Sequence, residues 1–442
     1  MPDNARSSSA AVQAQLDRLW ALSPGADVLG LGRITALLDR IGNPHRRLPP
    51  VLHVAGTNGK GSTCAFLRAA IEAAGLSCHV YTSPHLVRFN ERIRLAGTLI
   101  DDDALALLLA DVLDAGGDIG ASFFEVTTAA AFLAFSRTPA DACIIEVGLG
   151  GRLDATNVIN QPIVTGIAQL GIDHQGFLGD TLEAISLEKA GIAKRGVPLV
   201  TMDYPTGIAR RVGIMAGPVR GAPVKRLGVD WQRRVTRDTL EYGDDRGTVS
   251  TGLPRLFGPH QADNLALAIA MLRHQDALSI PLAAYRAAAE WAEWPARMQR
   301  LSPGPLTDRL PAGSELWLDG AHNPAAGAPL AAAIAARANG RPVHLVLGML
   351  AKKDARGLIR HFASFARSLQ PMPVAGHEHH DPAALALIAA DLGIRAQPAT
   401  DIAAALATIA GWADPADPPV VLIFGTLYQA GDALAANNQV PT

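Results

Sequence analysis

The feature that most constrains this chain is a glycine-rich turn between an apolar strand and an alanine-rich helix. The apolar run 51–55 leads into Gly56-Thr57-Asn58-Gly59-Lys60-Gly61-Ser62, and helical spacing continues to about residue 74. A helix N-terminus after such a turn presents backbone N–H groups to an anion, and Lys60 adds a charge for the β- and γ-phosphates. The hydroxyl of Ser62 or that of Thr63 can reach Mg²⁺. A tight turn alone explains the glycines but not Lys60 and Ser62 together, so the sequence predicts nucleotide binding.

The match to the standard phosphate loop is imperfect. In the usual pattern a Ser or Thr follows the lysine directly, whereas here Gly61 intervenes and the hydroxyl arrives one residue late. The chain contains no Asn-Lys-x-Asp guanine signature, which disfavours GTP and leaves ATP as the expected nucleotide.

Composition excludes several classes of protein. The 442 residues are 49% hydrophobic, which predicts two or three packed domains. Lys plus Arg (39) nearly balances Asp plus Glu (41), so charge gives no case for a nucleic-acid or membrane partner. The three cysteines are scattered, and no apolar run is long enough to span a bilayer. The N-terminus has no apolar signal core, so we expect a cytoplasmic protein that binds small molecules and needs no more than a monomer.

Strand and helix patterns alternate in the first two thirds of the chain. Helical spacing covers 11–41, and 210–257 is expected to form short β structure. Further strands are expected at 78–82, 142–145 and 163–167, and helices at 124–136, 181–191, 262–275 and 281–292. This alternation predicts a mostly parallel α/β sheet.

A second α/β pattern begins after Trp294-Pro295. Strands are expected at 316–318, 343–347 and 420–424, with helices at 324–338 and 400–411. The predicted fold class is therefore α/β, in two domains. Residues 1–295 form a phosphate-loop ATPase domain with a small β region and an N-terminal helical segment, and residues 296–442 form a Rossmann-like domain.

Polar residues follow several of the predicted strands. Glu146 ends an apolar strand, as a Walker B carboxylate does, and could bind Mg²⁺. His174, in Gly171-Ile172-Asp173-His174, could complete a second Mg²⁺ or Mn²⁺ site, although a lone histidine is more often a satisfied surface or core residue. In the turn 319–324, Asn323 is suited to cap the helix opened by Pro324, which leaves His322 to face a phosphate across a cleft.

At these motifs the sequence resembles the folylpolyglutamate synthase and dihydrofolate synthase family of the Mur ligase superfamily. The resemblance spans nearly the whole chain. Its segments are AGTNGKGST (55–63), YTSPHLVRFNERI (81–93), FFE (123–125), EVGLGGRLDATN (146–157), GIDH (171–174), SLEKAGI (186–192), HQADNLALA (260–268), PARM (295–298) and DGAHNP (319–324).

The resemblance implies a role for each matching residue. It implies ATP and Mg²⁺ at two sites, with Mn²⁺ as an alternative and a monovalent cation in addition. The catalytic residues would be Lys60, Lys189 and His322. The ATP contacts would be Thr57, Asn58, Gly59, Lys60, Gly61, Ser62, Asn264, Arg297 and Asp319. The metal ligands would be Ser83, Glu146, His174 and Lys189, the last in carbamylated form. The pterin or folate pocket would be Ser122, Phe123, Phe124, Glu125, Leu153, Asp154 and Ala155.

The reaction implied is an ADP-forming ligation of L-glutamate to dihydropteroate or a reduced folate. The pterin carboxylate attacks the γ-phosphate, and the glutamate amine then attacks the acyl phosphate while the C-terminal domain closes over ATP. One alternative is a Mur-type ligase acting on a UDP-linked carboxylate, but only 55 residues precede Gly56, too few for a uridine-binding domain. Another is a phosphate-loop ATPase with no ligase step, which the DGAHNP turn and the second α/β pattern disfavour.

Overall fold

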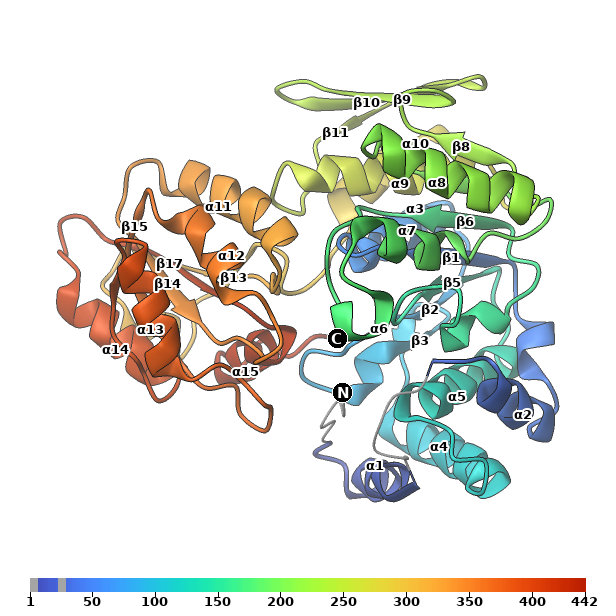
Figure 1. Ribbon diagram of the computed structural model, residues 1–442, viewed down its shortest axis with the longest axis horizontal. Helices are drawn as coiled ribbons and strands as arrows, with labels where there is room; N and C mark the ends of the chain where they lie inside the picture. The colour runs from blue at the N-terminus through green and yellow to red at the C-terminus, as the bar shows by residue number, and fades with distance from the viewer. Residues whose placement is uncertain (1–6, 23–28) are drawn as a thin grey trace.

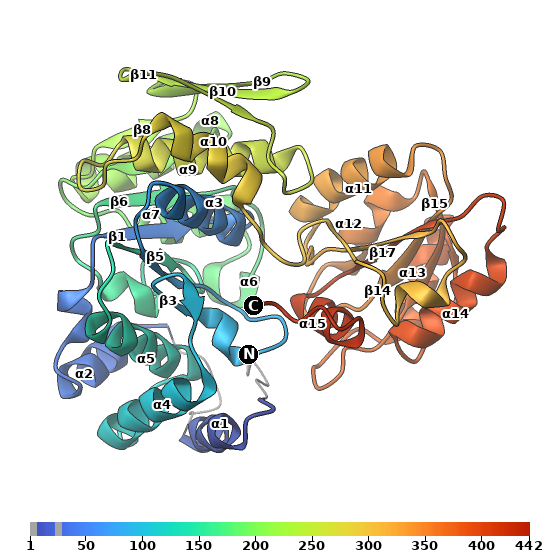
Figure 2. The same ribbon diagram turned by 180° about the vertical axis from the view of Figure 1, so that it is seen from behind.

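The computed structural model describes residues 7–22 and 29–442 and shows two sheet-centred units side by side (Figures 1 and 2). The N-terminal unit is built on an 8-stranded sheet of order β4-β3-β2-β5-β1-β6-β7-β8. Its strands are β1 (Val51–Ala55), β2 (Cys78–Tyr81), β3 (Ile93–Leu95), β4 (Thr98–Leu99), β5 (Ala142–Glu146), β6 (Val164–Ile167), β7 (Leu199–Thr201) and β8 (Val224–Arg226).

Strand order places the phosphate loop at the centre of this sheet. β1 pairs in parallel with β5 on one side and with β6 on the other, whereas β3 and β4 form an antiparallel edge. The carboxyl ends of parallel strands meet at one edge of a sheet, where ligand sites of α/β proteins form. The loop after β1, Glu146 at the end of β5 and the segment after β6 therefore lie together.

Helices cover both faces of the sheet. Side chains of β5 alternate between two cores: Ile144 lies in the core shared with α3, α9 and α10, and Ile145 lies in the core shared with α1, α2, α4 and α5. A strand buried on both faces is apolar throughout, which explains the short apolar runs of the sequence. The helical elements of this unit are α1 (Ala10–Leu22), α2 (Gly32–Arg40), η1 (Pro44–Arg47), α3 (Lys60–Ala73), η2 (Phe89–Arg92), α4 (Asp102–Gly116), α5 (Phe123–Arg137), η3 (Ala155–Val158), α6 (Gln175–Leu178), α7 (Leu182–Ala190), α8 (Thr206–Ile214), η4 (Met215–Val219), α9 (His260–Arg273) and α10 (Leu282–Trp291).

The helical pattern at 11–41 corresponds to α1 and α2, and residues 23–28 lie outside the described residues. The expectation of β structure throughout 210–257 is wrong at its start, because 206–219 form α8 and η4. Ile208, Val212 and Ala216 pack into the core at helical spacing, but Gly213 between them, Gly207 before them and Gly217-Pro218 after them obscure that pattern.

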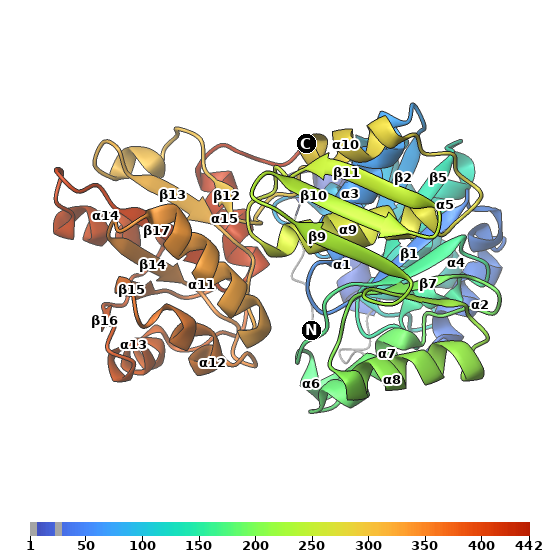
Figure 3. The same cartoon turned by 90° about the horizontal axis from the view of Figure 1, so that it is seen from above.

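The rest of 210–257 does contain the expected small β region. An antiparallel 3-stranded sheet, β9 (Trp231–Val235), β10 (Thr239–Asp244) and β11 (Gly247–Gly252), lies over α9 and α10 (Figure 3). Trp231 and Tyr242 stack beneath it with ring centroids 5.7 Å apart, so the ribbon is anchored by aromatic side chains to the N-terminal unit.

The C-terminal unit is a 6-stranded sheet of order β12-β13-β17-β14-β15-β16, parallel except for β12. It belongs to the Rossmann-like class that the sequence predicts, with helices on both faces. Its strands are β12 (Gln299–Arg300), β13 (Glu315–Leu318), β14 (Val343–Leu347), β15 (Ala366–Pro371), β16 (Arg395–Ala396) and β17 (Val420–Phe424). Its helical elements are η5 (Thr307–Arg309), α11 (Pro324–Ala338), α12 (Ala355–Ile359), η6 (Arg360–Phe362), α13 (Pro382–Asp391), α14 (Ile402–Trp412) and α15 (Leu427–Ala436).

The predicted α/β fold class is confirmed, with a parallel-rich N-terminal sheet and a separate C-terminal sheet. Among residues 7–22 and 29–442, no helix is long and apolar enough to cross a membrane.

Candidate active site

The phosphate loop is shaped by glycine at the start of α3. Gly59 has φ 84°, and a Cβ at this position would lie 2.4 Å from Oδ1 of Asn264. Only glycine suits both the conformation and the close approach. The first turn of α3, beginning at Lys60, supplies the N–H groups that a helix leaves without intrahelical partners. The N–H groups of Thr57 and Asn58 instead donate to the carbonyl of Gln169 at 2.9 and 3.1 Å.

Gly61, the departure from the standard loop, has a steric reason. A Cβ at Gly61 would lie 2.6 Å from atoms of the Trp294 indole ring. Trp294 lies in the segment that connects α10 to the C-terminal unit, and it packs against the N-terminal end of α3. Glycine is therefore needed where the two segments meet. Ser62, one residue later, is buried in the first turn of α3.

Two lysines converge on the carbonyl oxygen of Gly56. Nζ of Lys60 lies 3.2 Å from that oxygen, and Nζ of Lys189, from α7, lies 3.0 Å from it. Lys189 is 5% exposed, and burial followed by the nearby charge of Lys60 lowers the pKa of its ammonium group to about 7. A buried amine held in this way is neutral far more readily than a surface lysine.

Glu146 lies across the loop from Lys60. Its Oε1 is 4.0 Å from Nζ of Lys60, and burial raises the pKa of its carboxyl group to about 7 against the opposing charges of Lys60 and Arg297. Its Oε2 is buried without a hydrogen-bond partner among the described residues. A buried carboxylate oxygen without a partner fits a divalent cation.

Two other predicted metal ligands follow strands β2 and β6 of the same sheet as Glu146. Ser83 follows β2 and lines, with Glu146 and Arg297, a cavity of about 370 Å³. His174 follows β6 and lies exposed at the start of α6 with φ 53°. Within the described ranges no three His, Cys, Asp or Glu side chains converge on one point. A metal here would need the mixed hydroxyl, carboxylate and imidazole donors, which suit Mg²⁺ or Mn²⁺.

The C-terminal unit contributes the turn after β13. The carboxylate of Asp319 accepts hydrogen bonds from the N–H groups of Met298 and Ala321, each at 2.8 Å, and so fixes this turn. Asn323 caps α11 as predicted, with its Oδ1 accepting from the N–H of Ala326 at 3.0 Å. The turn is thus held in a single shape by its own polar side chains.

His322 and Asn323 also face the N-terminal unit. Nε2 of His322 lies 3.1 Å from Oδ2 of Asp173, and Nδ2 of Asn323 lies 3.2 Å from the same oxygen and 3.2 Å from Oδ1 of Asn58. Lys353, in the loop after β14, forms an ion pair with Oδ1 of Asp173. Burial alone would raise the pKa of Asp173, but the hydrogen bonds and positive charge of these neighbours hold that pKa well below its usual range.

Asn264 contacts the phosphate loop, and Arg297 contacts the turn after β13. Nδ2 of Asn264 donates to Oε1 of Gln261 at 3.0 Å, which orients its own oxygen over Gly59. Nη1 of Arg297 donates to the carbonyl of Ala296 at 2.9 Å, and its guanidinium lies against Gly320. Both side chains therefore border the space between the phosphate loop and the 319–324 turn.

The predicted pterin residues occupy two segments that meet at Gly148 and Leu149. The ring of Phe124 lies against Gly148, where an added Cβ would be 2.3 Å from it. The carboxylate of Asp154 accepts from the N–H of Leu149 at 2.8 Å, and it precedes the buried Ala155. These contacts bring 122–125 and 153–155 together, with Leu153 half-buried.

Several of these residues also have structural roles. Ser122 and Glu125 form a capping box at the start of α5, and Oε2 of Glu125 accepts from Nε of Arg33 at 2.9 Å. Phe123 is buried and stacks on Trp20 of α1 with ring centroids 4.8 Å apart. Asp154 caps η3. Their contact with a substrate therefore stays a prediction, and Phe124 is the aromatic side chain of the set that is less completely buried.

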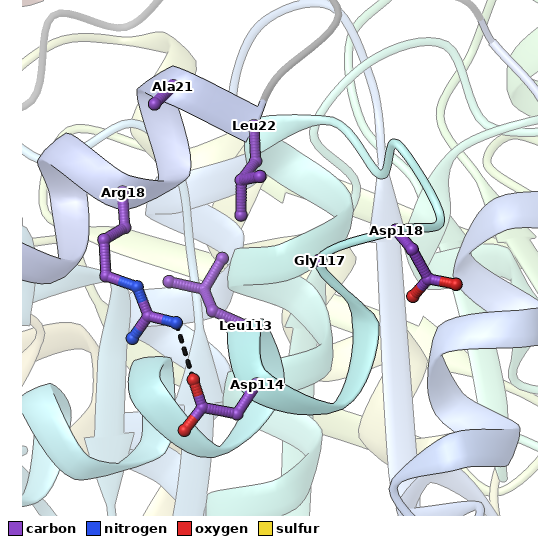
Figure 4. A pocket seen from close by; sticks show the side chains of 7 residues that line it. All are labelled: Arg18, Ala21, Leu22, Leu113, Asp114, Gly117 and Asp118. Carbon is purple, nitrogen blue, oxygen red and sulfur yellow. Dashed lines mark hydrogen bonds and ion pairs between the residues drawn. The ribbon is translucent and has the colours of Figure 1, made fainter.

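A different hollow of about 700 Å³ lies between α1 and α4 (Figure 4). Its lining includes Arg18 and Asp114, which form an ion pair at 2.5 Å, but no residue that the sequence predicts for the site. It is widely open, and we assign it no part in the candidate active site.

Sequence reasoning missed Trp294 and Lys353. Lys353 contacts a residue 180 positions earlier, and Trp294 contacts a residue 233 positions earlier, so no local pattern marks either one. The unusual Gly61 was the one available signal, because a glycine inside the first turn of a helix indicates close approach by another group.

Comparisons with known proteins agree with this fold. A family model described as the Mur ligase glutamate ligase domain matches residues 297–427. Dihydrofolate synthase/folylpolyglutamate synthase of Escherichia coli (strain K12) is 35% identical over 350 residues, covering 79% of this chain and 78% of that protein. E. coli FolC in complex with DHPP and ADP has a TM-score of 0.86 at 31% identity, covering 98% of this chain and 99% of the other. The bifunctional enzyme from Yersinia pestis complexed with AMPPNP and Mn has a TM-score of 0.84 at 30% identity, with coverage of 98% and 99%.

The fold and the site define an ATP-dependent ligase whose C-terminal unit is of the Mur ligase type. The chain belongs to the dihydrofolate synthase/folylpolyglutamate synthase family, which confirms the family predicted from its motifs.

Proposed function

We propose that this enzyme joins L-glutamate both to dihydropteroate and to reduced folates through an acyl-phosphate intermediate. The observation that carries the proposal is the meeting of three groups where the two units contact each other. Lys60 and Glu146 belong to the N-terminal unit, and His322 of the C-terminal unit reaches Asp173 after the neighbouring strand β6. The ring of Phe124 lies against Gly148, two residues after Glu146.

The first step activates the pterin carboxylate. The first turn of α3 and Lys60 hold the β- and γ-phosphates of ATP, with Thr57, Asn58, Gly59, Gly61 and Ser62 completing the loop. A carboxylate oxygen attacks the γ-phosphorus, the bond to the β-phosphate oxygen breaks, and ADP leaves. Lys60 and His322 approach the transferring group from the two units and offset its developing negative charge.

The second step forms the amide. The glutamate amine attacks the carbonyl carbon of the acyl phosphate, a proton leaves the nitrogen, and inorganic phosphate departs. Closure of the C-terminal unit over the loop would exclude water, which would otherwise hydrolyse the intermediate. Asn264, Arg297 and Asp319 are the further ATP contacts in this proposal, the first over Gly59 and the other two at the turn that faces the loop.

We propose that Ser83, Glu146, His174 and carbamylated Lys189 hold two divalent cations, Mg²⁺ or Mn²⁺, with a monovalent cation as a further ion. When bound there, such a cation would neutralise part of the charge on the phosphates. The unpartnered Oε2 of Glu146 supports a cation beside β5. Lys189 is buried next to Gly56 and close to the charge of Lys60, and both lower the pKa of its ammonium group, which makes the neutral amine that carbamylation requires accessible.

We further propose that the pterin lies against Phe124, between Ser122, Phe123 and Glu125 of one segment and Leu153, Asp154 and Ala155 of the other. The two segments are joined through Gly148 and Leu149, which lead directly from Glu146. A pterin held there would direct its carboxylate toward the phosphate loop.

The domain division that we propose is 1–295 for the ATP-binding domain and 296–442 for the glutamate ligase domain. α10 ends at Trp291, and the first strand of the C-terminal sheet begins at Gln299. We also propose a cytoplasmic monomer, which size-exclusion chromatography with light scattering would test for the oligomeric state.

The test of the proposed function is glutamate-dependent release of ADP, with dihydropteroate and tetrahydrofolate assayed in parallel. We expect release with both, absent when glutamate is omitted. Lys60→Ala is the matched inactive control, because alanine favours the helical conformation at the start of α3. Release with a UDP-muramoyl substrate alone would instead favour a Mur-type ligase, and glutamate-independent release would favour an ATPase without a ligase step.

A further inference from the structure

We propose that Lys353 is a positioning residue for the ligase reaction, which holds the C-terminal unit closed over the phosphate loop through its ion pair with Asp173. The proposal rests on the proposed function, because closure is what the reaction requires. It adds a residue that no motif of the sequence marks.

The ion pair joins the two units at the carboxyl edges of their sheets. Asp173 follows β6, the neighbour of β1, and Lys353 follows β14. The exposed fractions of the two side chains are 7% for Asp173 and 14% for Lys353. An ion pair that is largely withdrawn from water interacts more strongly than a surface pair, because solvent and salt screen it less.

Lys353 is held in place by its own unit. The carbonyl of Lys353 accepts a hydrogen bond from Nε2 of His380 at 2.8 Å, and the backbone N–H of Lys353 donates to the carbonyl of Leu350 at 3.0 Å. The next residue, Asp354, caps α12 by accepting from the N–H of Gly357 at 2.8 Å. Because these contacts fix the loop, Lys353 moves together with the rest of the C-terminal unit.

Asp173 is likewise fixed and shared. Its Oδ1 accepts from the N–H of His174 at 2.8 Å, and its Oδ2 lies within 3.1 Å of His322 and 3.2 Å of Asn323. Lys353 therefore binds one oxygen of a carboxylate whose other oxygen orients His322. Without the lysine, only His322 and Asn323 of the three C-terminal residues named here would still contact Asp173. The C-terminal unit would then close less completely over the phosphate loop.

The test compares kcat and KM in Lys353→Met, Lys353→Arg and Lys352→Met. Lys352 is exposed in the same loop and serves as the matched control. We expect Lys353→Met to lower kcat by about 10- to 100-fold, while the KM for dihydropteroate changes less than about threefold, because closure matters more to the transition state than to binding on the N-terminal unit. Lys353→Arg should recover most of the loss, and Lys352→Met should stay within about twofold of wild type.

A second readout is small-angle X-ray scattering with and without AMPPNP. The nucleotide analogue should compact the wild type and Lys352→Met but not Lys353→Met. If Lys353→Met fails to fold, Lys353→Gln carries the same test. A kcat within twofold of wild type in Lys353→Met, equal losses in Lys352→Met, or normal compaction without the lysine would overturn the proposal. If the wild type used no pterin or folate, the proposed function would fail, whereas the scattering comparison would still decide the role of Lys353.

Discussion

Gly431 in α15 offers a direct test of how closely the two units must approach. A Cβ at Gly431 would lie 1.8 Å from the carbonyl oxygen of Leu86, which belongs to the N-terminal unit three residues after Ser83. Leu86 cannot easily retreat, because Oε2 of Glu91 accepts from its N–H at 2.8 Å and Oε1 of the same carboxylate accepts from the N–H groups of Val87 and Arg88. Gly431→Ala must therefore move α15 away by about 1.6 Å to restore an ordinary contact near 3.4 Å.

A displacement of this size at the cleft should cost about 100-fold in kcat/KM, which corresponds to about 2.7 kcal/mol of transition-state stabilisation. The helix itself should be no less stable, because alanine favours a helix interior by roughly 0.5–1 kcal/mol over glycine. We would measure ADP release and urea unfolding together. Gly411→Ala in α14 is the matched control, since a Cβ at Gly411 meets no atom within 4 Å. It should raise stability by up to about 1 kcal/mol and leave turnover unchanged. Activity of Gly431→Ala within twofold of wild type would refute the reasoning.

Three further predictions concern separate parts of the molecule. Lys60→Met should lower kcat about 1000-fold with little change in the melting temperature, because the lysine serves the transferring phosphate rather than the core; steady-state ADP release checks this. Gly148→Ala would place a Cβ 2.3 Å from the Phe124 ring, so the KM for dihydropteroate should rise at least about tenfold while the KM for ATP stays constant. Asp244→Asn should lower the free energy of unfolding at pH 7 by about 1.5–3 kcal/mol, because Arg273 donates hydrogen bonds to both oxygens of this buried carboxylate. These hydrogen bonds lower the pKa of Asp244 by more than burial raises it. The stabilisation by ionised Asp244 is fully present above its pKa in the unfolded chain, near 3.9, and is lost as the pH falls through its lower pKa in the folded protein. The unfolding free energies of the wild type and Asp244→Asn, measured with urea, should therefore converge in acid. A constant gap at all pH values would contradict this assignment.

Much of the fold could be predicted from the sequence because the sheet strands are buried on both faces. The apolar runs at 51–55, 142–145 and 420–424 correspond to β1, β5 and β17 within a residue. The helix at 206–219 could not be predicted, because glycines and a proline interrupt its apolar spacing and only burial against the sheet stabilises it.

The site divides in the same way. Lys60 and Glu146 follow directly from a strand and its loop, and the capping role of Asn323 was readable from the following proline. The reason for Gly61 was not readable, because it lies in Trp294. The role proposed for Lys353 was not readable either, because the lysine forms its ion pair with Asp173 only where the two folded units meet.

The central claim is that the pterin carboxylate is activated by phosphorylation at the Lys60 loop. We would test it with dihydropteroate carrying ¹⁸O in both carboxylate oxygens. The account predicts that one labelled oxygen appears in each molecule of inorganic phosphate and that the other remains in the new amide carbonyl. Unlabelled phosphate released at the same rate as the amide product would contradict the account.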